Sequence, residues 1–291
     1  MDRHPVPSEP VPLGVWPCAQ RTAQHQRAGR YDPASTEHPG KMLPDLARRI
    51  VENYSDPGDL VVDPMCGIGT TLVEGAAVGR RCVGVELEER WAAVARSNLD
   101  RVLEPENRSL ADVHVGDARR LPGLLPDIAG SVDLVATSPP YACDAGTIDK
   151  AAWLAGRRLC EKATLNYSTR RANLGHARGE AYVAQMREVY EACFDVLRPD
   201  GLLVTVTKNT RRGGRLFDLA GGTVRLAHQV GFRYLQHVVA LLAGVRDGGL
   251  VARPSFWQVT QLRAAHDRGW PVHLVAHEDV LVFAKPQVTR G

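Results

Sequence analysis

The sequence predicts an α/β protein built on a mostly parallel sheet that is covered by helices on both faces. Two observations lead to this fold class. From residue 38 onward, short apolar segments of strand length alternate with longer segments of helical periodicity. Strands that alternate with helices along a chain form parallel sheets, and such sheets are buried on both sides.

The elements of the first half follow in regular order. A helix is predicted over 43–54, because Leu43, Leu46, Ile50 and Val51 recur at helical spacing. The strands predicted next are 60–62, 82–85, 113–115 and 132–136, with helices over 70–78 and 88–102. The rhythm stops between 142 and 180. It resumes with a helix over 181–197, a strand over 202–207, a helix over 216–230, and strands over 232–242 and 279–283. The last two strands have no clear helix between them and predict an antiparallel hairpin at a sheet edge.

The 291 residues suffice for one large domain or for a domain with a modest appendage. Residues 1–37, rich in Pro, Gln, Arg and His, predict an irregular basic arm. Residues 38–291 predict the main domain, with insertions at about 142–180 and 245–275. The chain has no apolar run of membrane-spanning length and no signal-peptide pattern, so a cytoplasmic protein is expected. None of the six cysteines forms a C-x-x-C pair, which argues against a metal site or a disulfide framework.

A glycine-rich segment, Asp63-Pro64-Met65-Cys66-Gly67-Ile68-Gly69-Thr70-Thr71, follows the first strand directly. Glycines lack Cβ atoms and let a ligand approach the backbone at a strand-to-helix turn. Glu86 and Asp117 end the next two strands, and a carboxylate in the position of Glu86 suits ribose hydroxyls. This pattern predicts an adenosyl ligand. A tight structural turn and a nicotinamide site are the alternatives, and the nicotinamide site would more usually show a complete G-x-G-x-x-G.

The segment Ser138-Pro139-Pro140-Tyr141 ends the fourth strand. Two prolines fix the backbone and remove two N–H donors, so the turn presents carbonyl oxygens and one hydroxyl. The amino group of a base needs acceptors for its protons, which Ser138 and the Pro139 carbonyl can supply. The Tyr141 ring can stack on the base, an interaction worth about 1–3 kcal/mol. The alternative is a Pro-rich loop, but the position after three strand-end carboxylates favours a catalytic site.

Together the segments 63–71 and 138–141 resemble the amino-methyltransferase family, which comprises DNA N4-cytosine and N6-adenine methyltransferases and their RNA relatives. The resemblance runs from His38 to about Lys208 and includes the strand before Lys285, in the unpermuted motif order. It implies a Rossmann-like class I methyltransferase fold, with a mostly parallel seven-stranded sheet and an antiparallel last strand. It also implies S-adenosylmethionine as the cofactor and a reaction that needs no metal.

Carried over by position, the resemblance places Asp63, Gly67 and Gly69 along the methionine end of the cofactor. It implies that Glu86 holds the ribose and Asp117 the adenine amino group, while the segment 38–41 closes over the methionine carboxylate. The cofactor residues it implies are His38, Lys41, Asp63, Pro64, Cys66, Gly67, Gly69, Thr70, Thr71, Glu86 and Asp117. The catalytic residues it implies are Ser138, Pro139, Pro140 and Tyr141.

Serine at the first position of the catalytic motif resembles N4-cytosine enzymes more than N6-adenine enzymes, which mostly carry Asp or Asn there. The predicted activity is therefore methylation of cytosine N4 in DNA, as in restriction-modification systems. Adenine N6 of DNA is one alternative. Guanine N2 of tRNA is another, because residues 63–67 resemble the cofactor loop of those enzymes equally well, although they usually carry an N-terminal RNA-binding domain that residues 1–37 do not supply. A small-molecule amine methyltransferase and an inactive cofactor-binding module that recognises nucleic acid or a partner chain also remain open.

A nucleic-acid partner is expected from the charge distribution, and the family resemblance favours DNA over RNA. Segment 142–178 carries seven basic and three acidic residues, an excess of four that exceeds the net charge of +3 for the whole chain. Trp153 and Tyr167 interleave with these charges, which suits phosphate contact and base stacking, although a solvated lid has the same composition. The predicted nucleic-acid contacts are Arg157, Arg158, Arg170, Arg171, Arg211, Arg212 and Arg253. The loop with Phe256 and Trp257 also suits a homodimer contact.

Overall fold

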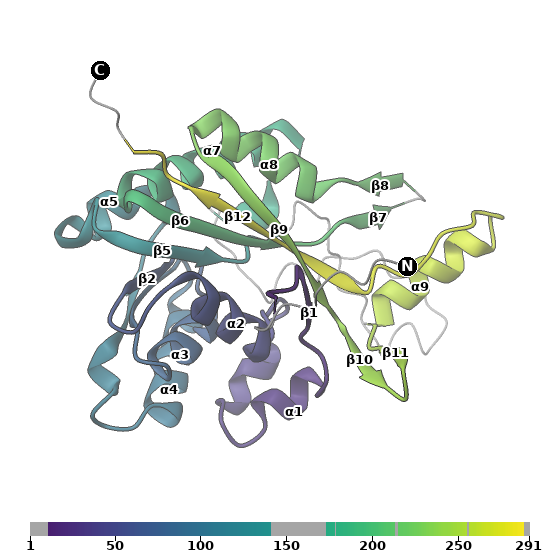
Figure 1. Ribbon diagram of the computed structural model, residues 1–291, viewed down its shortest axis with the longest axis horizontal. Helices are drawn as coiled ribbons and strands as arrows, with labels where there is room; N and C mark the ends of the chain where they lie inside the picture. The colour runs from purple at the N-terminus through teal and green to yellow at the C-terminus, as the bar shows by residue number, and fades with distance from the viewer. Residues whose placement is uncertain (1–10, 141–172, 178, 213–214, 255, 288–291) are drawn as a thin grey trace, which may run out of the picture.

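The computed structural model describes residues 11–140, 173–177, 179–212, 215–254 and 256–287. One mixed sheet forms the centre, with helices on both of its faces (Figure 1). Its strands are β1 (Val15–Pro17), β2 (Leu60–Asp63), β3 (Arg81–Glu86), β4 (Ala111–Val115), β5 (Val132–Thr137), β6 (Leu197–Thr207), β9 (Arg233–Leu241) and β12 (His277–Ala284).

The strand order across the sheet is β1-β9-β12-β6-β5-β2-β3-β4. The five strands from β6 to β4 are mutually parallel. β12 runs antiparallel to both of its neighbours, β6 and β9, and β1 adds a parallel strand outside β9. The predicted class, a mostly parallel sheet of seven strands with an antiparallel last strand, is confirmed. The eighth strand, β1, has only three residues, which is too short for a sequence pattern to reveal.

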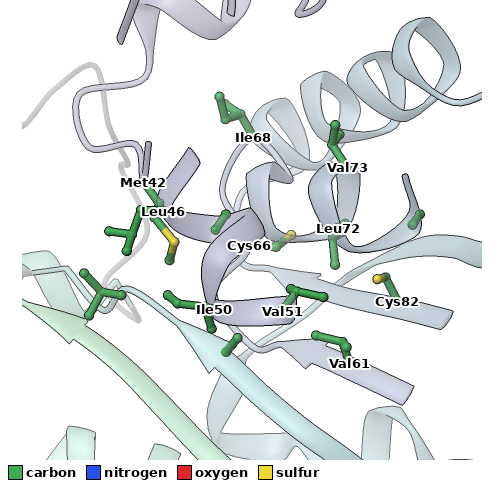
Figure 2. Packing of buried hydrophobic residues seen from close by; sticks show 14 of the residues in the cluster. Met42, Leu46, Ile50, Val51, Val61, Cys66, Ile68, Leu72, Val73 and Cys82 are labelled. Carbon is green, nitrogen blue, oxygen red and sulfur yellow. The ribbon is translucent and has the colours of Figure 1, made fainter. Parts of the chain in front are cut away.

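The helices cover the sheet in two layers. α2 (Pro44–Tyr54), α3 (Thr70–Ala76) and α4 (Glu89–Val102) pack on one face, and α5 (Leu121–Leu124), α7 (Gly179–Val196) and α8 (Leu219–Val230) pack on the other (Figure 1). Figure 2 shows Val51 of α2 between Val61 of β2 and Leu72 of α3, with Ile50 beside Val51 in the same cluster. The helical periodicity of 43–54 therefore predicts the buried face of α2 correctly.

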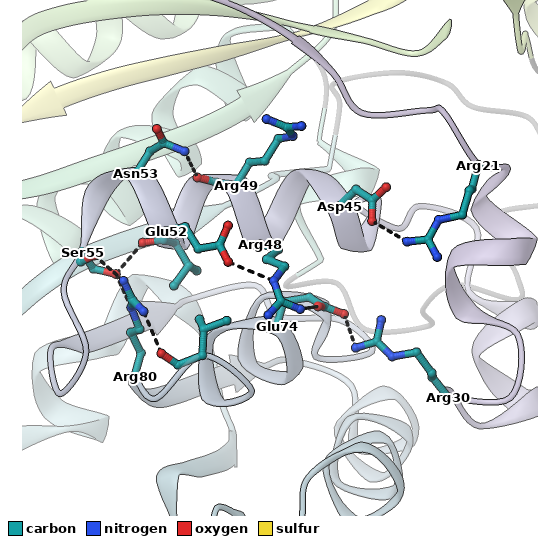
Figure 3. Close-up of polar contacts among 12 residues, drawn as sticks. Arg21, Arg30, Asp45, Arg48, Arg49, Glu52, Asn53, Ser55, Glu74 and Arg80 are labelled. Carbon is teal, nitrogen blue, oxygen red and sulfur yellow. Dashed lines mark hydrogen bonds and ion pairs between the residues drawn. The ribbon is translucent and has the colours of Figure 1, made fainter. Parts of the chain in front are cut away.

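The described part of the N-terminal arm, residues 11–37, is more regular than the sequence indicates. It forms β1, α1 (Ala23–Arg27) and the 3-10 helix η1 (Pro33–Glu37). Trp16 is buried near Tyr54 of α2, with ring centroids 6.1 Å apart. Figure 3 shows Arg30 paired with Glu74 of α3. These elements are short and are held by contacts with distant residues, so their local sequence carries little periodic signal.

The two late strands, β9 and β12, pair in antiparallel fashion as predicted, but they do not form an edge hairpin. β12 lies between β6 and β9. The chain that connects β9 to β12 forms a ribbon of β10 (Ala243–Arg246) and β11 (Gly249–Ala252), followed by α9 (Phe256–His266).

A second ribbon, of β7 (Thr210–Arg212) and β8 (Arg215–Phe217), follows β6. The predicted helix over 216–230 therefore begins later, at Leu219, because residues 215–217 are a strand. In Figure 1 the two ribbons and α9 extend beyond the carboxyl edge of the parallel strands.

Candidate cofactor and catalytic site

The carboxyl end of β2 carries the first predicted cofactor residue. The Asp63 carboxylate is buried, and it accepts hydrogen bonds from the Met65 backbone N–H (3.1 Å) and the Thr71 hydroxyl (2.7 Å). Burial raises the pKa of Asp63 to about 6. The Asp63 carboxylate therefore links Met65, before the loop glycines, to Thr71, after them.

Two glycines shape the loop itself. Gly67 and Gly69 have φ angles of 54° and 78°, in the left-handed region that favours glycine. A Cβ atom on Gly67 would lie 3.1 Å from Nε2 of His38, and one on Gly69 would lie 3.0 Å from Cβ of Ala95. Backbone conformation and close neighbours both require glycine at these positions.

The remaining loop residues divide between the core and the ligand side. Pro64 and Cys66 are buried, and a Cβ on Gly84 of β3 would lie 2.8 Å from the Cys66 sulfur. The Cys66 side chain therefore packs against the sheet, so only its backbone is available to a ligand. The Thr70 hydroxyl is buried and has no hydrogen-bond partner among the described residues, so it can bind a polar atom of a ligand.

Glu86 ends β3 and is only 7 % exposed. Its Oε2 accepts the Gly67 N–H (2.8 Å), and its Oε1 accepts the Glu88 N–H (2.9 Å). Burial raises the pKa of Glu86 to about 7, because its effect is larger than that of the two backbone hydrogen bonds, which lower the pKa. Each carboxylate oxygen can accept a further hydrogen bond, so Glu86 can fix the loop and still receive a hydroxyl group.

The segment that precedes α2 lies against the same loop. His38 is buried with its ring edge-on to Trp91 of α4, centroids 4.7 Å apart, and burial lowers the His38 pKa to about 4. The Lys41 ammonium donates to the carbonyl oxygens of Thr36 (3.3 Å) and His38. Burial, and then the Arg27 charge, lower the Lys41 pKa to about 8. A bound carboxylate would relieve this accumulation of positive charge.

Asp117 follows β4, as predicted, but its side chain is already engaged. The Asp117 carboxylate accepts hydrogen bonds from the backbone N–H of Arg119 (3.0 Å) and from its guanidinium Nε (2.9 Å). Burial alone would raise the pKa of Asp117, but the hydrogen bonds from Arg119 outweigh it and lower the pKa. In the predicted role, Asp117 accepts a hydrogen bond from the adenine amino group. That bond would have to use the carboxylate lone pairs that do not already accept hydrogen bonds from Arg119.

The predicted catalytic motif follows β5, which pairs with β2. Ser138 is half-buried and Pro139 is buried. The Pro140 carbonyl accepts a hydrogen bond from the hydroxyl of Tyr182 on α7 (2.9 Å), which fixes the turn from the other face of the sheet. Tyr141 lies outside the described residues. The ends of the adjacent strands β2 and β5 thus bring Asp63 and Ser138 to the same edge.

The residues present fit S-adenosylmethionine at most of the predicted positions. Gly67 and Gly69 add no side chain to the loop, and the buried Thr70 hydroxyl has no hydrogen-bond partner among the described residues. The buried carboxylates of Asp63 and Glu86 lie at the ends of β2 and β3. A ligand with amino and hydroxyl donors suits such acceptors. When bound, this cofactor supplies an electrophilic methyl group on a sulfonium.

The arginines predicted to contact nucleic acid lie in three different parts of the chain. Four of them lie outside the described residues: Arg157, Arg158, Arg170 and Arg171. Arg211 and Arg212 belong to β7. Arg253 donates from Nε to the Ala19 carbonyl (3.0 Å) and from Nη2 to the Gln20 carbonyl (3.3 Å). Its guanidinium therefore ties the region after β11 to the arm.

Two residues that support the site are absent from the predicted set. Asn98 of α4 is buried beside the glycine loop, and the Tyr182 hydroxyl donates to the Pro140 carbonyl of the predicted catalytic turn. A signal for Asn98 exists, because it is a polar residue in the apolar stripe that Trp91 and Ala95 form at helical spacing. Tyr182 has no such signal, since only the tertiary structure brings it to Pro140.

Two further findings concern the described part of the chain alone. No helix there has the length and apolar character needed to cross a bilayer. No group of three or more His, Cys, Asp or Glu side chains there has an arrangement that could hold a metal ion.

Comparison with known families bears on this site. Residues 2–97 match the model of the N6/N4 methyltransferase family, described as DNA methylase. This match confirms, for that part of the chain, the resemblance carried by the loop motif.

Curated relatives act on both DNA and tRNA, according to their names. The chain is 33% identical to a tRNA (guanine(10)-N2)-dimethyltransferase of Methanothermobacter thermautotrophicus, over 44% of this chain and 36% of the relative. It is 33% identical to the DNA adenine methyltransferase YhdJ of Escherichia coli, over 26% of each chain. The match thus spans about a third or less of the length of these relatives.

Solved structures extend the comparison to the fold. A geranyl diphosphate methyltransferase has a TM-score of 0.50 at 13% identity and covers 84% of this chain and 78% of its own. An S-adenosylmethionine-dependent O-methyltransferase from Thermotoga maritima has a TM-score of 0.50 at 14% identity, over 88% of this chain and 70% of its own. The fold is that of S-adenosylmethionine-dependent methyltransferases, and at the level of family and fold the predicted cofactor is confirmed.

Proposed function

We propose that this chain transfers a methyl group from S-adenosylmethionine to an exocyclic amino group of a nucleic-acid base. The observation that carries the proposal is the position of Ser138, Pro139 and Pro140 at the end of β5, next to the strand that ends in the Asp63 loop. The family match over residues 2–97 and the relatives named as DNA and tRNA methyltransferases support a base as the acceptor.

The turn of Ser138 to Tyr141 acts by positioning the amino group and by accepting hydrogen bonds from it. In this proposal the Ser138 hydroxyl and the Pro139 carbonyl accept hydrogen bonds from the amino group. These bonds draw the nitrogen lone pair out of conjugation with the ring and orient it toward the methyl group. The Tyr182–Pro140 hydrogen bond (2.9 Å) and two fixed proline φ angles keep the acceptors in place. Tyr141 stacks on the base.

Cytosine N4 of DNA is the proposed target, on the strength of the serine at position 138. The ribbon β7–β8 supports a nucleic-acid partner, because Thr210 to Phe217 contains three arginines and no carboxylate. Leu216 and Phe217 on this ribbon are 50 % and 45 % exposed. Arginines that contact phosphates and apolar side chains that enter an opened base step are typical of proteins that distort nucleic acid.

Guanine N2 of tRNA is the second candidate target. It is favoured by one specific finding, the similarity to the tRNA (guanine(10)-N2)-dimethyltransferase, which is longer than the similarity to the DNA adenine enzyme, 133 residues against 76. Both targets are exocyclic amino groups, so the same turn of Ser138 to Tyr141 would serve either.

The test of the proposed chemistry compares Ser138→Ala and Tyr141→Ala with the wild-type chain and with Ser131→Ala. Ser131 is an exposed serine just before β5 whose hydroxyl bonds to the Ile128 carbonyl, so it is a matched control. Turnover on nucleic acid should fall about 100-fold in the Ser138 variant, since it removes an acceptor that acts in the transition state. Binding of S-adenosylmethionine, measured by calorimetry, should stay within about twofold. Unchanged turnover in both motif variants would refute the assignment.

A further inference from the structure

One fully buried polar side chain joins two separate parts of the candidate cofactor site, the arm and the glycine loop. Asn98 lies on α4 and has an exposed fraction of 0 %. It is outside the family motifs at 38–41, 63–71 and 138–141. A buried amide without hydrogen bonds would destabilise the fold. The hydrogen-bond partners of Asn98 therefore show which segments it connects.

The amide of Asn98 is engaged on both of its polar atoms. Its Oδ1 accepts hydrogen bonds from the Asp32 backbone N–H (2.7 Å) and the Ser35 hydroxyl (3.2 Å). Its Nδ2 donates to the Ile68 carbonyl (2.8 Å) and to the Ser35 hydroxyl oxygen (3.0 Å). The Oδ1 bonds hold the arm, and the donor bond to Ile68 holds the glycine loop.

The bond to Ile68 completes the support of that loop. Ile68 lies between Gly67 and Gly69, the two residues with positive φ. The Gly67 N–H is held by Glu86 on β3, and the Ile68 carbonyl is held by Asn98 on α4. The backbone between the two glycines is thus fixed from both sides, although glycine is the most flexible residue.

The bonds to Asp32 and Ser35 place the segment that leads to His38. Asp32 is the N-cap of η1; its Oδ1 accepts a hydrogen bond from the Ala34 N–H (2.8 Å), and its Oδ2 accepts one from the Ser97 hydroxyl (2.6 Å). His38 follows η1 directly and packs on Gly67. Since Ser97 and Asn98 are consecutive residues of α4, this helix sets the position of η1 relative to the loop.

We infer that Asn98 is a positioning residue for cofactor binding, which holds the segment 32–41 against the loop of Gly67 to Gly69. The inference rests on the proposed function only in its choice of ligand, S-adenosylmethionine. Asn98 acts through its neighbours: the loop backbone that approaches the ligand, and the segment with His38 and Lys41 that covers it.

The test measures cofactor binding without any nucleic acid. Asn98→Ala should raise the Kd for S-adenosylmethionine about tenfold or more, because a bound conformation that is no longer preorganised binds more weakly. The KM for the cofactor should rise in parallel, while kcat at saturating cofactor stays within about twofold. Asn53→Ala is the matched control, because Asn53 is an exposed asparagine of α2 that bonds only to the Arg49 carbonyl of its own helix among the described contacts.

Should Asn98→Ala fail to fold, Ser35→Ala takes its place. It removes one hydroxyl and leaves the Asn98 bonds to Asp32 and Ile68 intact, so a rise in Kd of about threefold is expected. A folded variant at either position that binds the cofactor as the wild type does, or that loses kcat with unchanged Kd, would overturn the inference. A different result would separate the two proposals. If Asn98→Ala weakens cofactor binding but the wild-type chain methylates no base, the proposed function is contradicted and this inference stands.

Discussion

At the scale of single residues, the site is marked by carboxylates that are buried next to backbone donors. Asp63 and Glu86 both have raised pKa values because burial disfavours their charged forms, even though both accept backbone hydrogen bonds. Placing such groups at neighbouring strand ends costs stability. A site that binds a polar ligand explains that cost better than a structural turn does, because the ligand supplies the missing donors.

The Glu86 pKa predicts how stability varies with pH. Its folded-state pKa of about 7 lies above the ordinary value of 4.5. The folded chain therefore binds a proton more tightly than the unfolded chain does, and this contribution to stability is complete below pH 4.5 and lost as pH rises through about 7. Glu86→Gln removes the titration, so its free energy of unfolding should fall less than that of the wild type between these pH values.

Denaturant unfolding at several pH values measures the difference. Glu106→Gln, at an exposed glutamate after α4, is the control and should follow the wild-type curve. Identical pH slopes for Glu86→Gln and the wild type would show that Glu86 has no raised pKa in the folded chain.

At the scale of elements, the parts of the fold with regular periodicity are those that the sequence predicts. The helix with Ile50 and Val51 and the buried strands of the parallel sheet repeat their patterns locally. The arm and the ribbon β10–β11 do not, because they are held by contacts with distant residues. The arm depends on contacts such as Gln26 with Asp45, and the ribbon β10–β11 depends on Arg253 with Ala19.

Gln26 tests whether the arm is an integral part of the fold. Its buried amide donates to the carbonyls of Cys18 (2.9 Å) and Arg21 (3.0 Å) and accepts the Asp45 N–H (3.0 Å). Gln26→Ala leaves these groups without partners and should lower the free energy of unfolding by about 2–3 kcal/mol. Gln24→Ala, at an exposed position of the same helix, should change it by less than about 0.5 kcal/mol. Equal stability of the two variants would mean that the arm contributes little to the fold.

Lys285 tests the end of α7 in the same way. Its ammonium donates to the carbonyls of Phe194 and Leu197, both at 2.7 Å, where the helix leaves carbonyl groups unpaired. Lys285→Met should lower the free energy of unfolding by about 1–2 kcal/mol. Urea denaturation of this variant and of Arg233→Met, an exposed site on β9, provides the comparison. A loss no larger in Lys285→Met than in the control would contradict the capping role.

At the scale of the whole molecule, the carboxyl edge of the sheet carries the glycine loop, the turn at Ser138 and, beyond them, two ribbons (Figure 1). The positions of Asp63, Glu86 and Ser138 at strand ends were predictable, because parallel strands bring their carboxyl ends together. The pairing of Asp117 with Arg119 and the joining role of Asn98 were not. Both depend on side-chain geometry that no spacing pattern encodes.

The ribbon β7–β8 predicts a salt-dependent interaction. If Arg211 and Arg212 contact phosphates, replacing both with Gln should weaken nucleic-acid binding at all sequences. It should also reduce the slope of log K against log salt by about 2. Fluorescence anisotropy at several salt concentrations measures the slope. Arg253→Gln is the control, because its guanidinium holds the arm and should affect stability instead. An unchanged slope in the double variant would remove the ribbon from the interface.

The central claim is that the turn at Ser138 directs a methyl group to an exocyclic amino group of a base. Nucleoside mass spectrometry tests it most directly, with DNA and tRNA each incubated with the chain and isotope-labelled S-adenosylmethionine. The account predicts labelled N4-methylcytosine in DNA, formed about 100-fold more slowly by Ser138→Ala. Label in N6-methyladenine or N2-methylguanine would change the target and keep the chemistry. A chain that binds the cofactor but labels no amino-methylated nucleoside in either nucleic acid would contradict the claim.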